Sequence, residues 1–178
     1  VAVPPARHGD RRGFLSEVYN RDRFASAGID VDFFQDNHTF TAERGVIRGL
    51  HFQLPPFAQA KLVRVVQGEV IDVVVDIRHG SPTFGKHAAV HLSAENWKQL
   101  FVPAGFAHAF CTITENVAFL YKMSAPYSPD HDRGLAFDDP ALGIDWPVPA
   151  GEAILSDRDR NHPRLADLPV HFIYEADR

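Results

Sequence analysis

Short stretches in which apolar and polar residues alternate run through most of the chain, separated by turn-forming residues. Alternation over a few residues is typical of strands with one buried face. The 13 Pro and 12 Gly are spread along the sequence instead of being gathered in a linker, which fits many short strands joined by turns. We therefore predict an all-β fold with strands at residues 14–20, 32–41, 48–53, 61–67, 70–77, 86–92, 98–102, 107–112 and 117–123.

The most hydrophobic strand carries acidic residues on one side. In residues 70–77 the odd positions from Ile71 to Ile77 are aliphatic, and the opposite face holds Asp72 and Asp76. From this pattern, Asp72 faces either solvent or a polar pocket. The two charges also interrupt the longest apolar stretch, and no segment reaches the roughly 18 residues of a membrane span. A membrane protein is therefore excluded.

Only two short segments look helical: residues 21–27 with Asn20 as N-cap, and a stretch after Ser156. Many short strands with few helices predict a β-sandwich or barrel. No repeat or composition shift marks a domain boundary, so one domain spanning residues 1–178 is expected. Its expected parts are N-terminal strands at about 10–41, a barrel core at about 45–125 and a C-terminal wrap at about 126–178.

Composition narrows the function class. The 18 Lys+Arg and 23 Asp+Glu give a net charge of −5 with the 10 His neutral. Duplex binding requires a basic excess that neutralises phosphates, so a general nucleic-acid binder is excluded. Cys111 is the only cysteine and cannot form an internal disulfide, which favours a reducing compartment. Because the first residues lack the apolar core of a signal peptide, we expect a cytoplasmic protein.

Two histidines stand in polar clusters within strand-like sequence. His51 and Gln53 alternate onto the same face of one strand, and the turn that begins at Pro103 leads to His108. The spacing of these residues resembles the motifs of the cupin superfamily, but Gln53 stands where that superfamily has a second histidine, and its Glu is missing. The resemblance implies a cupin-type β-barrel or jelly roll whose pocket works without a metal or other cofactor, because a catalytic divalent metal usually takes three protein ligands.

A closer resemblance covers about residues 10–159. The matching segments are 10–14 with Glu17, 34–37, 48–53, 59–63, 68–70 with Asp72, 81–85, 103–108, 121–122 with 127–129, 138–140, 144–147, and 155–156 with Asp159. Together they resemble the dTDP-4-dehydrorhamnose 3,5-epimerase family. The resemblance implies an isomerase that converts dTDP-4-dehydro-6-deoxy-D-glucose into dTDP-4-dehydro-L-rhamnose for dTDP-L-rhamnose biosynthesis.

The epimerase chemistry explains why these residue types would be needed. Protons next to a ketone are removable because the carbanion delocalises into an enolate, and histidine is a suitable base near pH 7. The resemblance implies that His51 is this base and that Asp159 orients it. It also implies that Lys61 stabilises the enolate oxygen, with Arg48 and His108 nearby.

Inversion requires an acid on the other face of the sugar, and the resemblance implies Tyr121 for that role. Asp72 would pair with His108 or Lys61 so that no charge is buried alone. The implied substrate-binding residues also include Tyr127, which would stack on thymine, and Arg12, which would bind the pyrophosphate. The remaining ones are Glu17, Gln35, Asn37, Asp132 and Arg158.

Two of these positions depart from the family pattern. The family usually has a glutamate where this chain has Asp132 and a lysine where this chain has Arg158. The shorter carboxylate and the forked guanidinium are expected to change nucleotide affinity more than chemistry. Without the family, Asp159 also reads as a surface acid, Tyr121 as a core aromatic and Lys61 as a strand-end lysine.

Alternatives remain open at this point. The nearest is a mono-epimerase that inverts C3 or C5 only, and the others are a metal-dependent cupin and a non-catalytic sugar-binding barrel. The resemblance also implies a homodimer, because family members exchange N-terminal strands, so that Arg12 would serve the partner's pocket.

Overall fold

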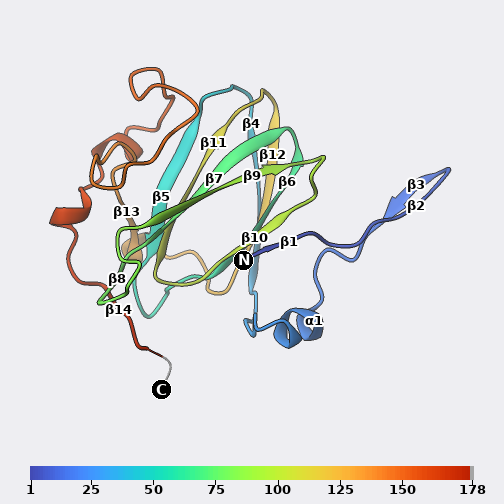
Figure 1. Cartoon of the computed structure of the whole chain (residues 1–178), viewed down its shortest axis with the longest axis horizontal. Coiled ribbons are helices and arrows are strands. Elements are labelled where there is room, and N and C mark those ends of the chain that lie inside the picture. Colours follow the sequence, from blue (N-terminus) through green and yellow to red (C-terminus); the bar gives the residue numbers. More distant parts are fainter. Residues whose placement is uncertain (177–178) are drawn as a thin grey trace.

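The computed structural model describes residues 1–176 and consists mainly of two five-stranded sheets packed face to face (Figure 1). In spatial order the first sheet contains β1 (Ala2–Val3), β10 (Gln99–Val102), β6 (Lys61–Gln67), β12 (Val117–Met123) and β4 (Gln35–Thr41). The second contains β13 (Asp132–Gly134), β5 (Ile47–Gln53), β11 (Phe106–Thr112), β7 (Glu69–Asp76) and β9 (His87–Ser93). All pairings within both sheets are antiparallel. The predicted all-β, cupin-like class is confirmed.

The remaining elements are short. They are the hairpin β2 (His8–Asp10) and β3 (Gly13–Leu15), the parallel pair β8 (Arg78–His79) and β14 (Phe172–Ile173), helix α1 (Arg21–Ser26), and the 3₁₀ turns η1 (Pro129–His131), η2 (Asp159–Asn161) and η3 (Leu165–Asp167). Among residues 1–176, no helix has the length and hydrophobicity needed to cross a bilayer.

Alternate residues of both sheets fill the space between them. Val63 and Val65 of β6 pack with Phe119 of β12 and with Val70 and Phe110 from the second sheet. The rings of Phe110 and Phe119 stack with their centroids 4.4 Å apart. Burying each such side chain contributes roughly 1.5–3 kcal/mol, so this layer is a main source of stability for the sandwich.

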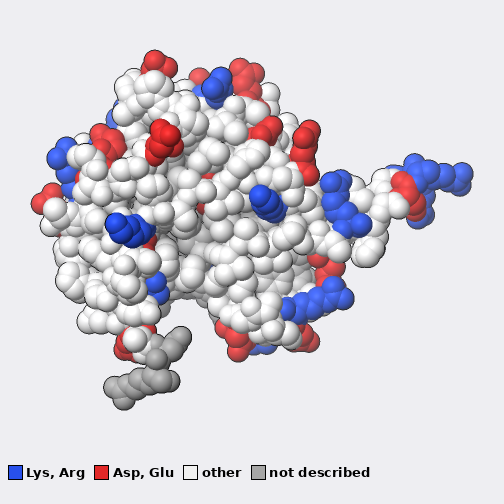
Figure 2. Space-filling view, in the orientation of Figure 1, with Lys and Arg blue, Asp and Glu red and all other residues white. Residues whose placement is uncertain are grey.

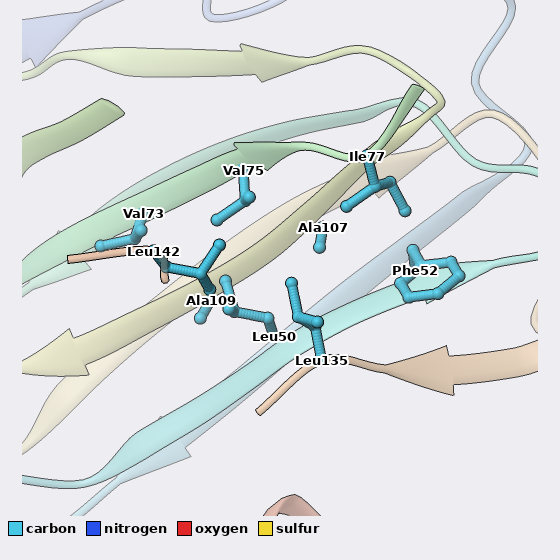
Figure 3. Packing of buried hydrophobic residues seen from close by; sticks show 9 residues of the cluster. All are labelled: Leu50, Phe52, Val73, Val75, Ile77, Ala107, Ala109, Leu135 and Leu142. Carbon is cyan, nitrogen blue, oxygen red and sulfur yellow. The ribbon is translucent and has the colours of Figure 1, made fainter. Parts of the chain in front are cut away.

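The outer face of the second sheet is also buried. Figure 3 shows Val73, Val75 and Ile77 packed with Leu135 and Leu142, which come from the chain after the barrel. This C-terminal segment covers the sheet as an orange to red layer in Figure 1. The aliphatic face predicted for residues 70–77 therefore faces the wrap.

The opposite face of β7 points between the sheets. Asp72 is 0% exposed there and bonds to His108, so the alternative in which Asp72 faces solvent is wrong. A strand buried on both faces offers no solvent side, and alternation alone does not reveal this.

Several predicted boundaries change near the N-terminus. The strand expected at 14–20 ends at Leu15. The Asn20 side chain caps α1, as expected, by accepting a bond from the Arg23 N–H at 3.2 Å. The strand expected from residue 32 begins at Gln35. The helical stretch expected after Ser156 is limited to the two 3₁₀ turns η2 and η3.

The β2–β3 hairpin forms an arm that projects away from the sheets (Figure 1). The Arg7 guanidinium at its base lies 4.2 Å from the Phe14 ring and 4.5 Å from the Trp97 ring. The arm carries Arg7, Arg11 and Arg12 together with Asp10, and Figure 2 shows mostly blue side chains along it, whereas the charges on this face of the body are scattered. At the other end, the expected wrap runs to residue 178, and its last two residues lie outside the described part.

Candidate active site

A cavity of about 580 Å³ opens between the two sheets, a volume within the usual range of small-ligand sites. Its walls come from β4, β5, β6, β11 and β12 together with residues 154–159 of the C-terminal wrap. The predicted site residues that line it are Arg48, His51, Lys61, His108, Tyr121, Arg158 and Asp159.

Strand alternation places these side chains on facing walls. Lys61 and Tyr121 belong to the first sheet, whereas His51 and His108 belong to the second and are directly paired across β5 and β11. Because alternate residues share a face, Lys61 lines the interior together with Val63. His51 and Tyr121 therefore line opposite walls of the cavity.

His51 is held by a buried carboxylate. Its Nε2 lies 2.6 Å from Oδ1 of Asp159, which is only 5% exposed. Burial acts to raise the pKa of Asp159, but the His162 and His51 imidazoles and the Gly49 N–H outweigh it and hold the pKa well below its usual range. Asp159 is therefore ionised at neutral pH, and its bond to Nε2 leaves the lone pair on Nδ1 of His51 free.

Gly49 allows β5 and β11 to approach closely beside these histidines. Its φ is +122°, and an added Cβ would lie 2.5 Å from the backbone oxygen of His108. The register between β5 and β11 shifts between His108 and Phe110, which marks a bulge. The glycine thus sets the position of the strand that carries His51.

A second buried pair lies deeper between the sheets. Nε2 of His108 is 3.0 and 2.9 Å from the two carboxylate oxygens of Asp72. Burial raises the pKa of Asp72, and His108 and Lys61 partly oppose that rise. Burial lowers the pKa of Lys61 to about 8, although the negative charges of Asp132 and Asp72 act to raise it. Asp72 therefore pairs with His108 and also acts on Lys61 electrostatically.

Two buried polar atoms have no hydrogen-bond partner within the described residues. They are Oγ1 of Thr39, beside the cavity, and Nε2 of His162, beside the His51–Asp159 pair. Neither residue is predicted from the sequence. Thr39 lines the cavity on the same face of β4 as Asn37, which alternation could have indicated. His162 follows Asp159 by one 3₁₀ turn, where positions i and i+3 share a side.

Five predicted nucleotide-binding residues form a connected polar rim. Gln35 donates to Asn37 at 2.9 Å and accepts from the Tyr127 N–H at 3.0 Å. Oδ2 of Asp132 then accepts bonds from the Tyr127 hydroxyl at 3.1 Å and from Arg158 at 2.8 Å. Asp132 and Arg158, the two departures from the family pattern, are thus bonded to each other.

The structure does not bring Arg12 and Glu17 to this cavity. Arg12 pairs with Asp10 in the projecting hairpin, and Glu17 pairs with Arg23 at 3.1 Å. Neither residue lines the cavity of its own chain.

The metal site of the cupin superfamily does not fit these residues. The amide of Gln53 is used in bonds with Phe57, Pro126 and Ser128, and His108 is bonded to Asp72. A four-ligand site centred on His51 and His108 would thus lack free donors.

Comparisons with known proteins agree with this geometry. A family model described as dTDP-4-dehydrorhamnose 3,5-epimerase matches residues 1–167. The dTDP-4-dehydrorhamnose 3,5-epimerase of Sinorhizobium fredii is 51% identical over 172 residues, which cover 97% of this chain and 88% of the relative.

Solved structures are similar over most of their length. The dTDP-6-deoxy-D-glucose-3,5-epimerase of Legionella pneumophila, in complex with dTDP-4-keto-L-rhamnose, superimposes with a TM-score of 0.93 at 40% identity, covering 98% of this chain and 93% of that one. A 3'-monoepimerase from Streptomyces bikiniensis, in complex with dTDP-quinovose, has a TM-score of 0.86 at 38% identity, with coverages of 93% and 83%. On the family match and these identities, the chain belongs to the dTDP-4-dehydrorhamnose 3,5-epimerase family.

Proposed function

We propose that this protein converts dTDP-4-dehydro-6-deoxy-D-glucose into dTDP-4-dehydro-L-rhamnose by inverting C3 and C5. The observation that carries the proposal is the placement of His51, paired with Asp159, and Tyr121 on opposite walls of one cavity. A binding protein has no use for a base and an acid on opposite sides of its ligand.

The first step is proton removal next to the C4 ketone. Nδ1 of His51 accepts the proton, and the imidazolium that forms keeps its bond from Nε2 to the ionised Asp159. A positioned acid or base typically contributes 10²–10⁴-fold. Asp159 supports this step by fixing the tautomer and by neutralising the new charge.

The enolate oxygen needs a cation, and Lys61 is proposed to supply it. Lys61 lines the cavity, where its ammonium acts in a partly dehydrated site. Arg48 lines the same cavity, with its Nε 3.3 Å from Thr41 Oγ1. His108, bonded to Asp72, is proposed as a further donor to the sugar.

The second step returns a proton to the opposite face of the ring. Tyr121 is proposed as the donor because it projects from β12, across the cavity from His51. The alternative is an enzyme that performs this step at one carbon only. The 3'-monoepimerase among the solved relatives supports this alternative.

The nucleotide is proposed to bind along the polar rim, with the thymine against Tyr127 and Arg158 near the phosphates. Arg12 and Glu17 lie away from the cavity of their own chain. We therefore propose a homodimer in which the arm of one copy reaches the cavity of the other. A cytoplasmic location is part of the same proposal, and it is supported by the single Cys111, which favours a reducing compartment.

Deuterium incorporation distinguishes the candidate activities. The protein is incubated with dTDP-4-dehydro-6-deoxy-D-glucose in D₂O, and exchange at C3 and C5 is followed by NMR. Exchange with inversion at both carbons is the expected result, and exchange at one carbon identifies a mono-epimerase. No exchange at either carbon would overturn the epimerase assignment. Sedimentation of a monomer at micromolar concentration would contradict the dimer.

A further inference from the structure

Three potential metal-ligand atoms converge at His51, the proposed catalytic base. They are Nε2 of His51, Oδ1 of Asp159 and Nε2 of His162, all within 4.8 Å of one another. The first two are 2.6 Å apart, and Nε2 of His162 is 3.4 Å from the same carboxylate oxygen. This is the one such group of three found among residues 1–176.

Apart from its 3.4 Å approach to Asp159, which helps to lower the pKa of that carboxyl, His162 has no polar partner within the described residues. Its side chain is 8% exposed, and Nε2 has no hydrogen-bond partner in the described structure. Leaving a buried polar atom unpaired costs about 1–3 kcal/mol. The imidazole is held against Gly134, where an added Cβ would lie within 2.3 Å of three ring atoms, and edge-on to the His51 ring at 5.6 Å. The free nitrogen is therefore fixed in place.

The three donor atoms suit a divalent cation of intermediate hardness, such as Zn²⁺. Two imidazole nitrogens and one carboxylate oxygen form the usual three-ligand set of a zinc site with one open position. Tetrahedral zinc with bonds near 2.1 Å separates its ligand atoms by roughly 3.4 Å, which is the Asp159–His162 distance. Nε2 of His51 would have to move by only about 0.8 Å relative to Asp159 to reach that separation.

Local charge also permits a cation. Asp159 offers one negative charge, and both histidines are neutral when they act as ligands. The guanidinium of the adjacent Arg158 is directed to Asp132 at 2.8 Å. Its positive charge is therefore already paired.

We propose that His51, Asp159 and His162 form an inhibitory binding site for Zn²⁺ or a similar transition-metal ion. The ion takes the place of the proton shared by His51 and Asp159. With Nε2 bound to metal, the ring proton resides on Nδ1, so His51 has no lone pair left for the substrate. Zinc binding and proton abstraction therefore exclude each other. The site is distinct from the metal position of the cupin superfamily, because Asp159 and His162 lie outside its motifs.

Metal binding is measured without reference to activity. Chelator-treated protein is titrated with Co²⁺, and the visible spectrum reports the coordination number, while calorimetry with Zn²⁺ gives the affinity and stoichiometry. We expect one ion per chain and the intense bands of four-coordinate cobalt. Mg²⁺, which prefers oxygen ligands, should not compete.

His162→Gln is the test variant, and His38→Gln on the exposed outer face of β4 is its matched control. We expect at least a tenfold loss of Zn²⁺ affinity in His162→Gln and none in His38→Gln. The zinc concentration that halves the epimerisation rate, taken relative to each untreated variant, should rise by the same factor. If His162→Gln does not fold, the cobalt spectrum of the unaltered protein still tests the proposed site. Six-coordinate cobalt, or zinc affinity equal in both variants, would overturn the proposal.

Discussion

Nε2 of His51 lies 2.6 Å from Oδ1 of Asp159, a residue 108 positions further along the chain. The bond joins a strand of the second sheet to the wrap that covers that sheet. Orientation of the base therefore depends on docking of the C-terminal segment, and the same packing that buries Leu135 and Leu142 prepares the site.

Asp159→Asn should keep the fold and remove most of the activity. The amide preserves the shape but cannot neutralise an imidazolium, and it favours the wrong tautomer of His51. We expect a fall in kcat of roughly 10²–10⁴-fold, measured as the rate of deuterium exchange at C3. His51→Asn should abolish exchange at both carbons. A rate for Asp159→Asn within threefold of the unaltered enzyme would remove Asp159 from the mechanism.

Tyr121→Phe should separate proton removal from inversion. The ring still fills its place between the sheets, but the hydroxyl that returns the proton is gone. Exchange of deuterium catalysed by His51 should continue, while formation of the inverted product falls by about 10²-fold or more. Comparing exchange with inversion in one NMR time course checks this. Equal loss of both would indicate that Tyr121 only positions the substrate.

Lys61 predicts an alkaline limit to catalysis. Burial lowers its pKa to about 8, so the ammonium present below that pH is lost above it, and with it the charge opposite the enolate. We expect kcat/KM, which reports groups of the free enzyme, to decline with an apparent pKa near 8. Lys61→Arg should move this decline to higher pH, because guanidinium stays charged. An unmoved decline would assign it to another group.

The sequence predicted the strands better than it predicted their surroundings. Most predicted ranges agree with the observed strands to within about two residues, because alternation records which residues share a face. It does not record what covers that face. In β7 both faces are buried, so the pattern could not tell whether Asp72 pointed to solvent or toward His108.

The site was predictable to a similar degree. The family resemblance identified residues that the structure gathers around one cavity, including His51 and Tyr121. It did not identify His162, whose position depends on a 3₁₀ turn that brings it back to Asp159. It also could not show that the arm carrying Arg12 projects away from its own cavity, since that depends on the path of the chain in space.

Gly49 should tolerate no side chain. Alanine there would require a φ near +122° and would place its Cβ against the His108 backbone. We expect Gly49→Ala to lower the free energy of unfolding by about 2–5 kcal/mol and to reduce activity in the folded fraction. Gly151→Ala, where a Cβ meets nothing within 4 Å, should change stability by less than about 0.5 kcal/mol. Equal denaturation midpoints for the two variants would contradict this role.

The buried carboxylate of Asp76 should make the free energy of unfolding depend on pH in the acidic range. This carboxylate is 1% exposed and accepts bonds from Arg78 at 2.7 Å and from the Ser81 and Thr83 hydroxyls at 2.6 Å each. Burial acts to raise the pKa of Asp76, but these donors outweigh it and hold the pKa far below the ordinary value of 3.8. The stabilisation is therefore complete above about pH 4 and is lost as the pH falls further.

Asp76→Asn tests this dependence. At pH 7 the substitution should cost about 3–5 kcal/mol, because Arg78 loses its buried partner. Asp145→Asn, at an exposed position, should cost less than about 0.5 kcal/mol. Between pH 5 and pH 2 the melting temperature should fall more steeply for the unaltered protein than for Asp76→Asn, since the variant has already lost the titrating carboxylate. Parallel curves would show that Asp76 is not a source of the acid sensitivity.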